Sequence, residues 1–564
     1  MGKRATKLTR SFATALFGVA VAALLGACAA GETSDAIVGA DSYPTSALDH
    51  LEHDDLGSMP QDVDEQDDFN YGEAQATLRS GINGIAHRYI APVHIDELSL
   101  NGIQGLATID PAFALSMEDG MIRVRLADDY IADFPRPLSS YPENWANLTT
   151  SIIRAARKHS TELRSADNER IYEAVFDGML AGLDIFSRYS GAEQARANRA
   201  RRNGFGGIGI RFTRVKDAVL ITHIQDGGPA QRVKLRRGDK ILKINKTSTF
   251  ALSLRKIAAL FRGPVGSALT LSVARLDNDA ARPERHISLN LKRAHIVPET
   301  VRAIIEGDML KLTITSFNSK TAPNMNDILR SNAEAFENGL IKGVVMDLRG
   351  NPGGLLSQSV DVADLFLNQG RIIATRGRHP DSFHDYRAGG TDVINGRPLV
   401  VLVDGDSASA AEIVASALQD LGRAVVVGSS SYGKGTVQTV IRLPNDGEMT
   451  LTWSRLVSPS GYALHGLGVM PTVCATNTLN GDTGAVLALD HIDEQRAAIS
   501  TWRAAGMIFD GRRPHLRDSC PAKSLRHDEN DDFLMKLASS VLHDPSLYLR
   551  ALMQSDPINT ASRY

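Results

Sequence analysis

The sequence is short of three things: cysteine, net charge and long hydrophobic runs. Only 3 cysteines occur in 564 residues, which excludes a small scaffold held together by many disulfide bonds. A net charge of −3 supplies no strong positive field, which argues against nucleic acid as a partner. Because single hydrophobic cores rarely grow beyond about 250 to 300 residues, the chain should contain more than one domain.

The apolar run near the amino terminus, residues 12–25, is shorter than the roughly 20 residues that span a bilayer as a helix. Basic residues precede this run, as in a secretion signal. The run ends in Leu-Gly-Ala-Cys at Cys28, which resembles the bacterial lipobox. That resemblance implies a signal peptide over residues 1–27 and lipidation of Cys28. The alternative is an ordinary signal peptide in which Cys28 is incidental.

Lipidation would place the protein in a bacterial cell envelope. The chain would face the periplasm and contact a membrane only through the lipid anchor, and Ala29 after the cysteine favours the outer membrane. In such an oxidising compartment the remaining cysteines, Cys474 and Cys520, have reason to pair. The sequence gives no distance between them, so two buried free thiols remain the alternative to this predicted disulfide bond.

Composition and periodicity divide the rest of the chain into five segments. Residues 28–75 are acidic and lack apolar periodicity, which is typical of a disordered tether. Residues 76–200 mix helical periodicity with short strand-like pieces. Residues 201–295 show the period of two of a compact β module, with strands expected at Ile208–Thr213, Ala218–Ile224, Lys240–Ile244 and Ala268–Ala274. Residues 296–475 alternate buried-type strands, such as Leu399–Val403, with helices, which predicts parallel strands in an α/β layer. Residues 476–564 are predicted to be a mainly helical extension.

The fold class that follows is multidomain α/β, with helical regions at both ends. One basic stretch stands out before the β module. We interpret it as a solvated helix face rather than a phosphate-binding patch; its residues are Arg196, Arg199, Arg201 and Arg202.

Two motifs in the α/β segment carry nucleophile chemistry. A serine hydroxyl needs a nearby base to take its proton and donors to hold the oxyanion. Residues 404–412, Asp-Gly-Asp-Ser-Ala-Ser-Ala-Ala-Glu, stand where a buried strand turns into a helix, whose amino terminus offers unpaired amides. After the next strand, residues 428–438 hold Lys434 between two glycines. A lysine can act as the base if desolvation lowers its pKa.

Together the two motifs resemble those of the carboxyl-terminal processing peptidases, also called tail-specific proteases. Lys434 follows Ser409 by 25 positions, the spacing between serine and lysine in that family. This spacing selects Ser409 over the neighbouring serines. The resemblance extends through residues 347–354, the family's turn before the oxyanion site. Ala411 and Tyr432 depart from the family pattern without removing a catalytic group.

The resemblance implies a set of roles. Ser409 would be the nucleophile, Lys434 the general base and Gln438 the residue that orients the lysine. The amides of Gly354 and Ala410 would form the oxyanion hole. Lys434 and Gln438 are four positions apart, so they would face one side if that segment were helical. The implied core fold is the crotonase and ClpP-like α/β layer, and neither a metal nor another cofactor is implied.

The β module resembles a PDZ domain. Residues 206–210, Gly-Gly-Ile-Gly-Ile, are similar to the loop whose amides hold a peptide's terminal carboxylate, although glycines can also simply make hairpins. The implied partners are proteins or peptides with free carboxyl termini, and an adaptor lipoprotein remains open. The residues of this loop are Gly207, Ile208, Gly209 and Ile210.

Three alternatives compete with a Ser-Lys endopeptidase. Residues 428–434 spell most of a nucleotide-binding loop, but Gly435 stands where the magnesium hydroxyl belongs. An inactive PDZ scaffold lipoprotein would not need intact Ser409, Lys434 and Gln438. Crotonase-like acyl-CoA enzymes share the fold alone and lack a Ser-Lys pair at this spacing. The sequence therefore favours a serine endopeptidase that cleaves envelope proteins near their carboxyl termini through an acyl-enzyme.

Overall fold

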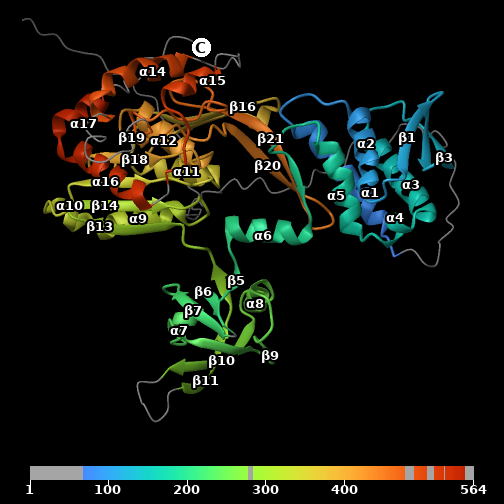
Figure 1. The fold of residues 1–564 in the computed structure, drawn as a ribbon, viewed down its shortest axis with the longest axis horizontal. Coiled ribbons are helices and arrows are strands. Elements are labelled where there is room, and N and C mark those ends of the chain that lie inside the picture. Colours follow the sequence, from blue (N-terminus) through green and yellow to red (C-terminus); the bar gives the residue numbers. More distant parts are fainter. Residues whose placement is uncertain are drawn as a thin grey trace, which may run out of the picture. The chain divides into compact units, whose positions relative to one another are not determined.

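A computed structural model describes residues 68–216, 218–276, 284–476, 488–504, 513–525 and 528–552 (Figure 1). The predicted signal peptide, Cys28 and residues 29–67 lie outside these ranges. Residues 71–75, assigned above to the tether, belong to the first helix, where Ala74 is buried. In the described ranges no helix is both long and apolar enough to cross a membrane.

The amino-terminal region packs helices on a three-stranded antiparallel sheet around a core that Leu443, Met449 and Leu451 from later in the chain also enter. The helical spacing of Ile171, Val175 and Met179 predicts a buried face, and all three are buried on α5. Ile122 and Val124 alternate towards the same core from β2. The elements are α1 (Tyr71–Arg88), α2 (Ile95–Gln104), η1 (Gly105–Thr108), β1 (Phe113–Glu118), β2 (Met121–Leu126), β3 (Asp129–Pro135), α3 (Pro142–His159), α4 (Thr161–Ser165), α5 (Asn168–Leu180), β4 (Arg188–Ser190) and α6 (Ala192–Asn203).

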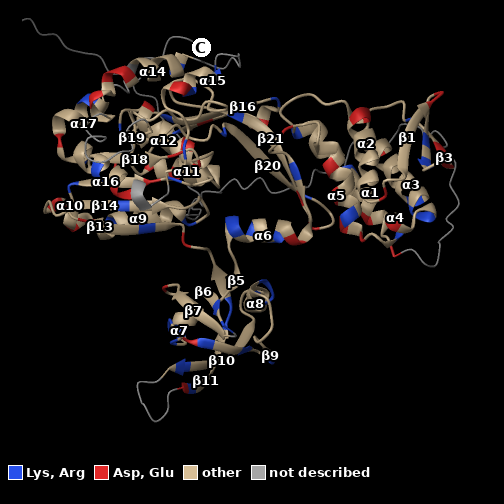
Figure 2. Cartoon of the chain, in the orientation of Figure 1, with Lys and Arg blue, Asp and Glu red and all other residues tan. Residues whose placement is uncertain are grey.

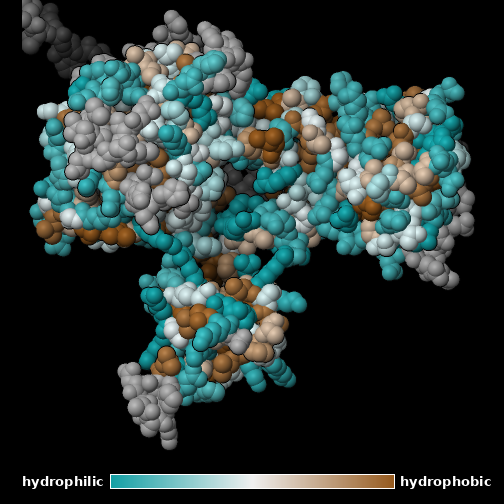
Figure 3. All heavy atoms as spheres, in the orientation of Figure 1, coloured by the Kyte–Doolittle hydropathy of each residue, from teal (hydrophilic) through white to brown (hydrophobic). Residues whose placement is uncertain are grey.

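The β module is a sheet in the order β11-β10-β8-β7-β6, with β6 at an edge. The period-of-two pattern finds β7 and β8 at their observed bounds. The predicted strands do not include β11, although Ile287, Leu289 and Leu291 alternate there with polar residues. Hydrophobic atoms reach the surface of this module (Figure 3), among them those of Val215, Phe250 and Val265. The elements are β5 (Phe205–Gly207), β6 (Ile210–Val215), β7 (Ala218–Ile224), α7 (Pro229–Arg232), β8 (Lys240–Ile244), β9 (Thr247–Ser248), α8 (Leu254–Phe261), β10 (Ala268–Leu276), β11 (Glu284–Lys292) and β12 (Ala294–Ile296).

A six-stranded sheet in the order β13-β14-β15-β18-β19-β22 forms the centre of the α/β segment. All neighbouring pairs from β14 to β22 are parallel, which confirms the prediction from strand and helix alternation. Its elements are β13 (Val301–Glu306), β14 (Met309–Ile314), α9 (Thr321–Ser331), α10 (Ala333–Glu337), β15 (Gly343–Asp347), α11 (Leu356–Asp364), β18 (Leu399–Val403), α12 (Ala410–Asp420), β19 (Val425–Gly428) and β22 (Val473–Cys474).

Both faces of the central strands β15, β18 and β19 are buried, so these strands are almost wholly apolar, whereas the edge strand β13 is mostly exposed. Val344 and Met346 enter the cluster under α9, α11 and α12, whereas Val345 between them enters the opposite cluster. The opposite face is covered by α16 (Asp528–His543) and α17 (Pro545–Leu552) of the carboxyl-terminal extension, through side chains such as Leu537 and Val541. In α14 (Ile492–Ala504), Ile492 joins this cluster, whereas Ile499 and Trp502 join the first one. The extension also contains α15 (Arg513–Leu516) and η3 (Arg517–Ser519).

A second sheet, in the order β17-β16-β21-β20, carries β4 on the β21 strand. The strand β20 follows directly after Lys434, so this sheet supports the lysine segment. Its strands are β16 (Arg371–Gly377), β17 (His384–Arg387), β20 (Thr436–Arg442) and β21 (Glu448–Val457), and η2 (Pro380–Ser382) lies between β16 and β17.

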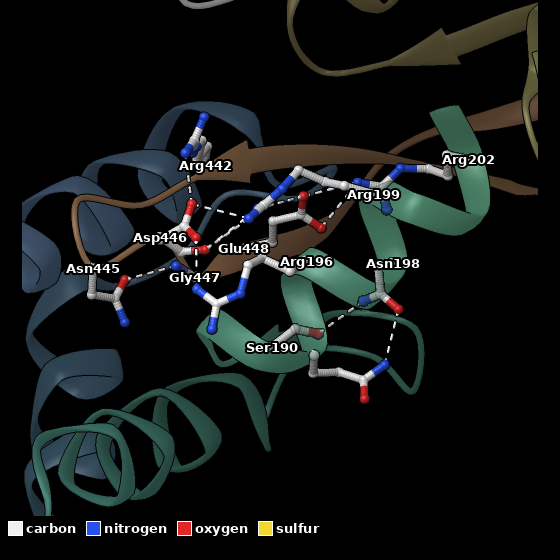
Figure 4. A network of polar contacts seen from close by, with 11 residues as sticks. Ser190, Arg196, Asn198, Arg199, Arg202, Arg442, Asn445, Asp446, Gly447 and Glu448 are labelled. Carbon is white, nitrogen blue, oxygen red and sulfur yellow. Dashed lines mark hydrogen bonds and ion pairs between the residues drawn. The ribbon is translucent and has the colours of Figure 1, made fainter. Parts of the chain in front are cut away.

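The basic helix α6 is fastened to the hairpin between β20 and β21, as Figures 2 and 4 show. Arg199 and Arg202 pair with Glu448 at 3.1 and 2.9 Å, and the Glu448 side chain is only 3% exposed. Arg199 and Arg196 also pair with Asp446, each at 3.0 Å. The interpretation of this stretch as a solvated face is therefore wrong for Arg199 and Arg202, whose guanidinium groups are partly buried and ion-paired. The sequence did not show these pairs because the acceptors lie 246 or more residues away in the chain.

We expect Glu448→Ala to destabilise the protein by about 2 kcal/mol, because it leaves two partly buried guanidinium groups without their shared carboxylate. Thermal unfolding followed by circular dichroism should show a midpoint lower by about 5 °C. Glu143→Ala removes an exposed ion pair with Arg79 and should leave the midpoint unchanged. Equal midpoints for the two variants would contradict a structural role for the network.

Candidate active site

Ser409 lies in the turn between β18 and α12, at the carboxyl end of a parallel strand. Ligands of open α/β sheets bind at this edge. The serine backbone has φ 57° and ψ −112°, a conformation that costs a non-glycine residue on the order of 1–3 kcal/mol. Such a strained strand-to-helix turn exposes a nucleophilic side chain. Ser409 is accordingly only partly buried, although Ala408 and Ala410 on either side of it are buried.

The Gly353–Gly354 turn lies directly against this serine. A Cβ atom added to Gly353 would stand 2.9 Å from Ser409 Cβ and 3.0 Å from the amide nitrogen of Ala410, so no larger residue fits. Asn351 holds the glycine turn and the serine turn together. Its carbonyl oxygen accepts a hydrogen bond from Ala408 N at 2.9 Å, and its side-chain oxygen accepts one from Gly353 N at 2.8 Å. The structure thus brings the predicted oxyanion segment and the predicted nucleophile together.

Both predicted oxyanion donors are available. Throughout the described part of the chain, the amides of Gly354 and Ala410 donate to no protein oxygen. For Ala410 the reason is its position at the first turn of α12, where the helix has no partner for the amide. An oxygen that develops negative charge beside Ser409 would find these two donors already in place.

Glu412, buried in the first turn of α12, joins the serine segment to the lysine segment. Its Oε2 accepts from the amides of Ser409 at 2.6 Å and Lys434 at 3.0 Å. Its Oε1 accepts from Ser431 Oγ at 2.5 Å and Gly433 N at 2.6 Å. Burial raises the pKa of this carboxyl, and the four donors oppose the rise. One side chain therefore joins the backbones of both segments that the sequence predicts to be catalytic.

Lys434 lies in the loop between β19 and β20 and is half-buried. Its Nζ stands 4.9 Å from the centre of the Phe186 ring. In the described residues, no hydrogen bond joins Nζ to Ser409 or to Gln438. Burial and the charge of Arg188 lower the pKa of Lys434, while Glu412 and Asp184 oppose the shift. The loop continues into a strand, whereas a nucleotide-binding loop would open a helix, so the geometry also disfavours that alternative.

Gln438 lies on β20, and the helical segment considered for Lys434 and Gln438 is wrong. A four-residue spacing also returns to one face of an extended chain, but the pairing register of β20 shifts between Val437 and Gln438. The Gln438 amide donates to Thr436 Oγ1 at 2.9 Å and to Thr452 Oγ1 at 3.5 Å. Thr452 in turn donates to Asp184 at 2.9 Å.

Comparison with known proteins decides the family. Residues 308–475 match the family described as Peptidase family S41, and residues 220–275 match the PDZ domain. Over 314 residues the chain is 35% identical to the carboxy-terminal-processing protease of Bartonella bacilliformis. This alignment covers 56% of this chain and 71% of that protein. The chain belongs to the carboxy-terminal processing proteases of peptidase family S41.

Other relatives of this S41 protease include the carboxy-terminal processing protease CtpA of Bacillus subtilis, 30% identical over 322 residues. That alignment covers 55% of this chain and 65% of the Bacillus protein. Among solved structures, the photosystem II D1 C-terminal processing protease is 23% identical, with a TM-score of 0.33, over 66% of this chain and 92% of that chain.

In the PDZ domain of this S41 protease, Gly207 ends β5 and Ile210 begins β6, and the predicted carboxylate loop 207–210 therefore joins the two strands through Ile208 and Gly209. Within the described ranges, the amides of Ile208 and Gly209 donate to no protein oxygen. The loop borders a cavity of about 250 Å³, which Phe212 and Phe261 also line. Free amides beside an apolar cavity and an open strand edge are the features of a peptide-binding groove.

Two further predictions concern cysteine and metal. Cys474 and Cys520 form a disulfide bond in the structure, with Cα atoms 5.9 Å apart. Cys28 lies outside the described residues. In the part of the chain that the structure describes, no group of three or more His, Cys, Asp or Glu side chains could hold a metal ion.

Sequence reasoning assigned no role to Glu412 or Phe186. For Glu412 a signal exists, because Ser-x-x-Glu at a helix start is the pattern of a capping box. That pattern predicts contact with the serine amide but not with the amides of Gly433 and Lys434. Nothing near Phe186 in the sequence marks it as a neighbour of Lys434, which lies in another part of the chain.

We expect Glu412→Gln to lower the rate of proteolysis by about 10²-fold, because an amide NH₂ group would face amide donors and displace the two segments by a fraction of an ångström to an ångström. Initial rates on an unstructured protein such as casein measure the effect. Glu337→Gln, at an exposed position of α10, is the matched control and should retain the rate. Full activity of Glu412→Gln would exclude this role.

Proposed function

We propose that the chain is a Ser-Lys endopeptidase that cleaves proteins of the bacterial envelope near their carboxyl termini. The observation that carries this proposal is that Glu412 Oε2 accepts hydrogen bonds from the backbone amides of both Ser409 and Lys434. This shared acceptor holds the proposed nucleophile and the proposed base next to each other. The free amides of Gly354 and Ala410 beside this pair supply the remaining requirement for acyl transfer.

The proposed reaction begins with a neutral Lys434, which takes the proton of Ser409 as the hydroxyl oxygen attacks the scissile carbonyl carbon. The oxyanion accepts hydrogen bonds from Gly354 and Ala410. When the C–N bond breaks, the lysine ammonium donates its proton to the leaving amine. Water then attacks the carbonyl carbon of the acyl-enzyme and gives a proton to the lysine; the bond between this carbon and Ser409 Oγ breaks, the lysine returns the proton to Oγ, and the carboxylic acid product leaves.

The lysine side chain has to move before this reaction can start, because its Nζ lies over the Phe186 ring and, in the described residues, makes no hydrogen bond with Ser409. Gln438 would then hold the lysine side chain toward Ser409. The three-membered set of serine, lysine and glutamine is thus proposed for the state with bound substrate.

Selection of carboxyl termini would come from the PDZ domain. The free amides of Ile208 and Gly209 can hold a terminal carboxylate, and the cavity beside Phe212 and Phe261 can take an apolar side chain. The open edge of β6 can pair with the peptide backbone as an added strand.

We further propose a crotonase and ClpP-like fold for the core, supported by a parallel sheet with helices on both faces. The envelope location, the lipid on Cys28 and an adaptor lipoprotein as a partner belong to the same proposal. The Cys474–Cys520 disulfide bond fits an oxidising compartment.

Ser409→Ala should abolish cleavage while leaving peptide binding intact. The measurement is cleavage of envelope proteins, with sequencing of the new carboxyl termini by mass spectrometry. Affinity of the variant for a peptide with an apolar carboxyl terminus, determined by calorimetry, should equal that of the parent. Ser331→Ala, at an exposed position of α9, is the control serine and should remain active. Retained cleavage by Ser409→Ala would exclude the mechanism, and an inactive parent that still binds peptides would favour the scaffold alternative.

The pH profile tests the lysine. Because the pKa of Lys434 is lowered, kcat/KM should rise with pH along a limb whose midpoint lies below the ordinary lysine value. Arg188→Gln removes a repelling charge, so the pKa should rise and the limb should move to higher pH. Since Arg188 is exposed, a shift of a few tenths of a pH unit is expected, larger at low salt. Arg201→Gln, exposed on α6, should leave the limb in place, and identical limbs for all three proteins would contradict the assignment.

A further inference from the structure

The carboxyl-terminal extension, which begins after the residues that match Peptidase family S41, reaches both catalytic loops through the segment 517–525. On the serine side, Gly405 N donates to Lys523 O at 2.8 Å and Leu525 N donates to Asp404 Oδ2 at 3.2 Å. On the lysine side, Ser429 Oγ donates to Lys523 O at 2.8 Å. One short segment thus contacts the turn before Ser409 and the loop before Lys434.

Arg517 makes the most direct of these contacts. Its Nη2 donates to the carbonyl of Ser431 at 2.6 Å, and its Nη1 donates to the carbonyls of Tyr432 at 3.1 Å and Gly466 at 3.4 Å. Gly433 has φ +90°, and a Cβ atom there would stand 3.0 Å from Arg517 Nη1. The planar guanidinium therefore lies against the three residues that precede Lys434.

Glu412 binds the donors of the same loop: it accepts hydrogen bonds from Ser431 Oγ, Gly433 N and Lys434 N. Arg517 binds the loop's acceptors, the carbonyl groups of Ser431 and Tyr432. A loop whose donors and acceptors are both satisfied by buried or partly buried ionic groups has little freedom to shift, because each displacement breaks charge-assisted hydrogen bonds.

Arg517 is placed for these carbonyls rather than for a carboxylate. In the described residues it forms no ion pair, and burial lowers its pKa. The disulfide bond of Cys520 with Cys474 on β22 lies three residues beyond it in the chain, and Arg513 Nη1 donates to the carbonyl of His465 at 2.7 Å on the other side. The backbone that carries Arg517 is thus fastened to the core on both sides.

We propose that Arg517 is a positioning residue for Lys434, which makes the segment 517–525 of the extension part of the catalytic apparatus. This inference rests on the proposed Ser-Lys mechanism. Arg517 acts through the loop backbone. Without its hydrogen bonds to the three carbonyl groups, the loop shifts, and the amides of Gly433 and Lys434 no longer align with the carboxylate of Glu412. The lysine side chain is then too far from Ser409 to accept its proton. Capture of a peptide terminus by the PDZ domain does not involve this contact.

The test compares Arg517→Ala and Arg517→Lys in the full chain with Arg550→Ala. Arg550 belongs to the same extension but pairs with Asp493 at the surface, so it is a matched control. Steady-state kinetics on a peptide with an apolar carboxyl terminus should show kcat lower by about 10²-fold in Arg517→Ala, with KM and the calorimetric affinity for the peptide unchanged. Arg517→Lys should recover several-fold of that loss, and Arg550→Ala should match the parent.

Two results would overturn the inference while leaving the Ser-Lys mechanism standing. One is an active parent whose Arg517→Ala variant keeps kcat within twofold. The other is a fractional loss of kcat that equals the fraction of unfolded protein at the assay temperature, as measured in the thermal melt, and that is no longer seen when the assay is run at a lower temperature. That pattern is expected of an arginine with a purely structural role. If Arg517→Ala does not fold, the kcat of Arg517→Met decides, because methionine keeps the length of the stem without a donor, and a value equal to that of the parent would exclude positioning. An inactive parent contradicts the proposed function itself.

Discussion

The active site depends on the burial of one carboxylate, that of Glu412. A carboxylate without access to water is costly unless hydrogen bonds replace its hydration. Here three amides and one hydroxyl do so, and they come from two segments that follow different strands of the same sheet. The requirement to satisfy this side chain therefore forces the turn of Ser409 and the loop of Lys434 into contact, and the strained backbone of Ser409 persists because that contact holds it.

A second constraint acts through the parallel sheet. Its strands are apolar on both faces, so two layers of helices are needed, and the chain supplies the second layer only in its last segment. Because α16 and α17 pack on this face, the segment 517–525 that precedes them in the chain contacts the loops of Ser409 and Lys434. The Arg517 contacts therefore follow from burial of the sheet, and the Cys474–Cys520 bond adds a covalent link to β22.

Local patterns predicted much of the backbone. Strands Ala218–Ile224, Lys240–Ile244 and Leu399–Val403 occur at their predicted bounds, because alternation or continuous apolarity reports directly on which faces are buried. The same alternation is present in β11 at Ile287, Leu289 and Leu291, so that strand was also predictable from the sequence. β20 was open to a helical interpretation because a four-residue spacing suits both a helix and a strand. The basic stretch of α6 was misjudged because the buried Glu448 that it pairs with lies far along the chain.

The sequence by itself determined the family and the order of its motifs. The spacing of Ser409 and Lys434 and the glycines near Gly354 mark backbone that only certain residue types can adopt, and such requirements are local. Only the tertiary structure decided that Glu412 joins the two catalytic segments, that Lys434 lies over Phe186, and that Arg517 reaches the lysine loop. These are contacts between side chains distant in sequence, and their energies depend on burial and approach, which no local pattern encodes.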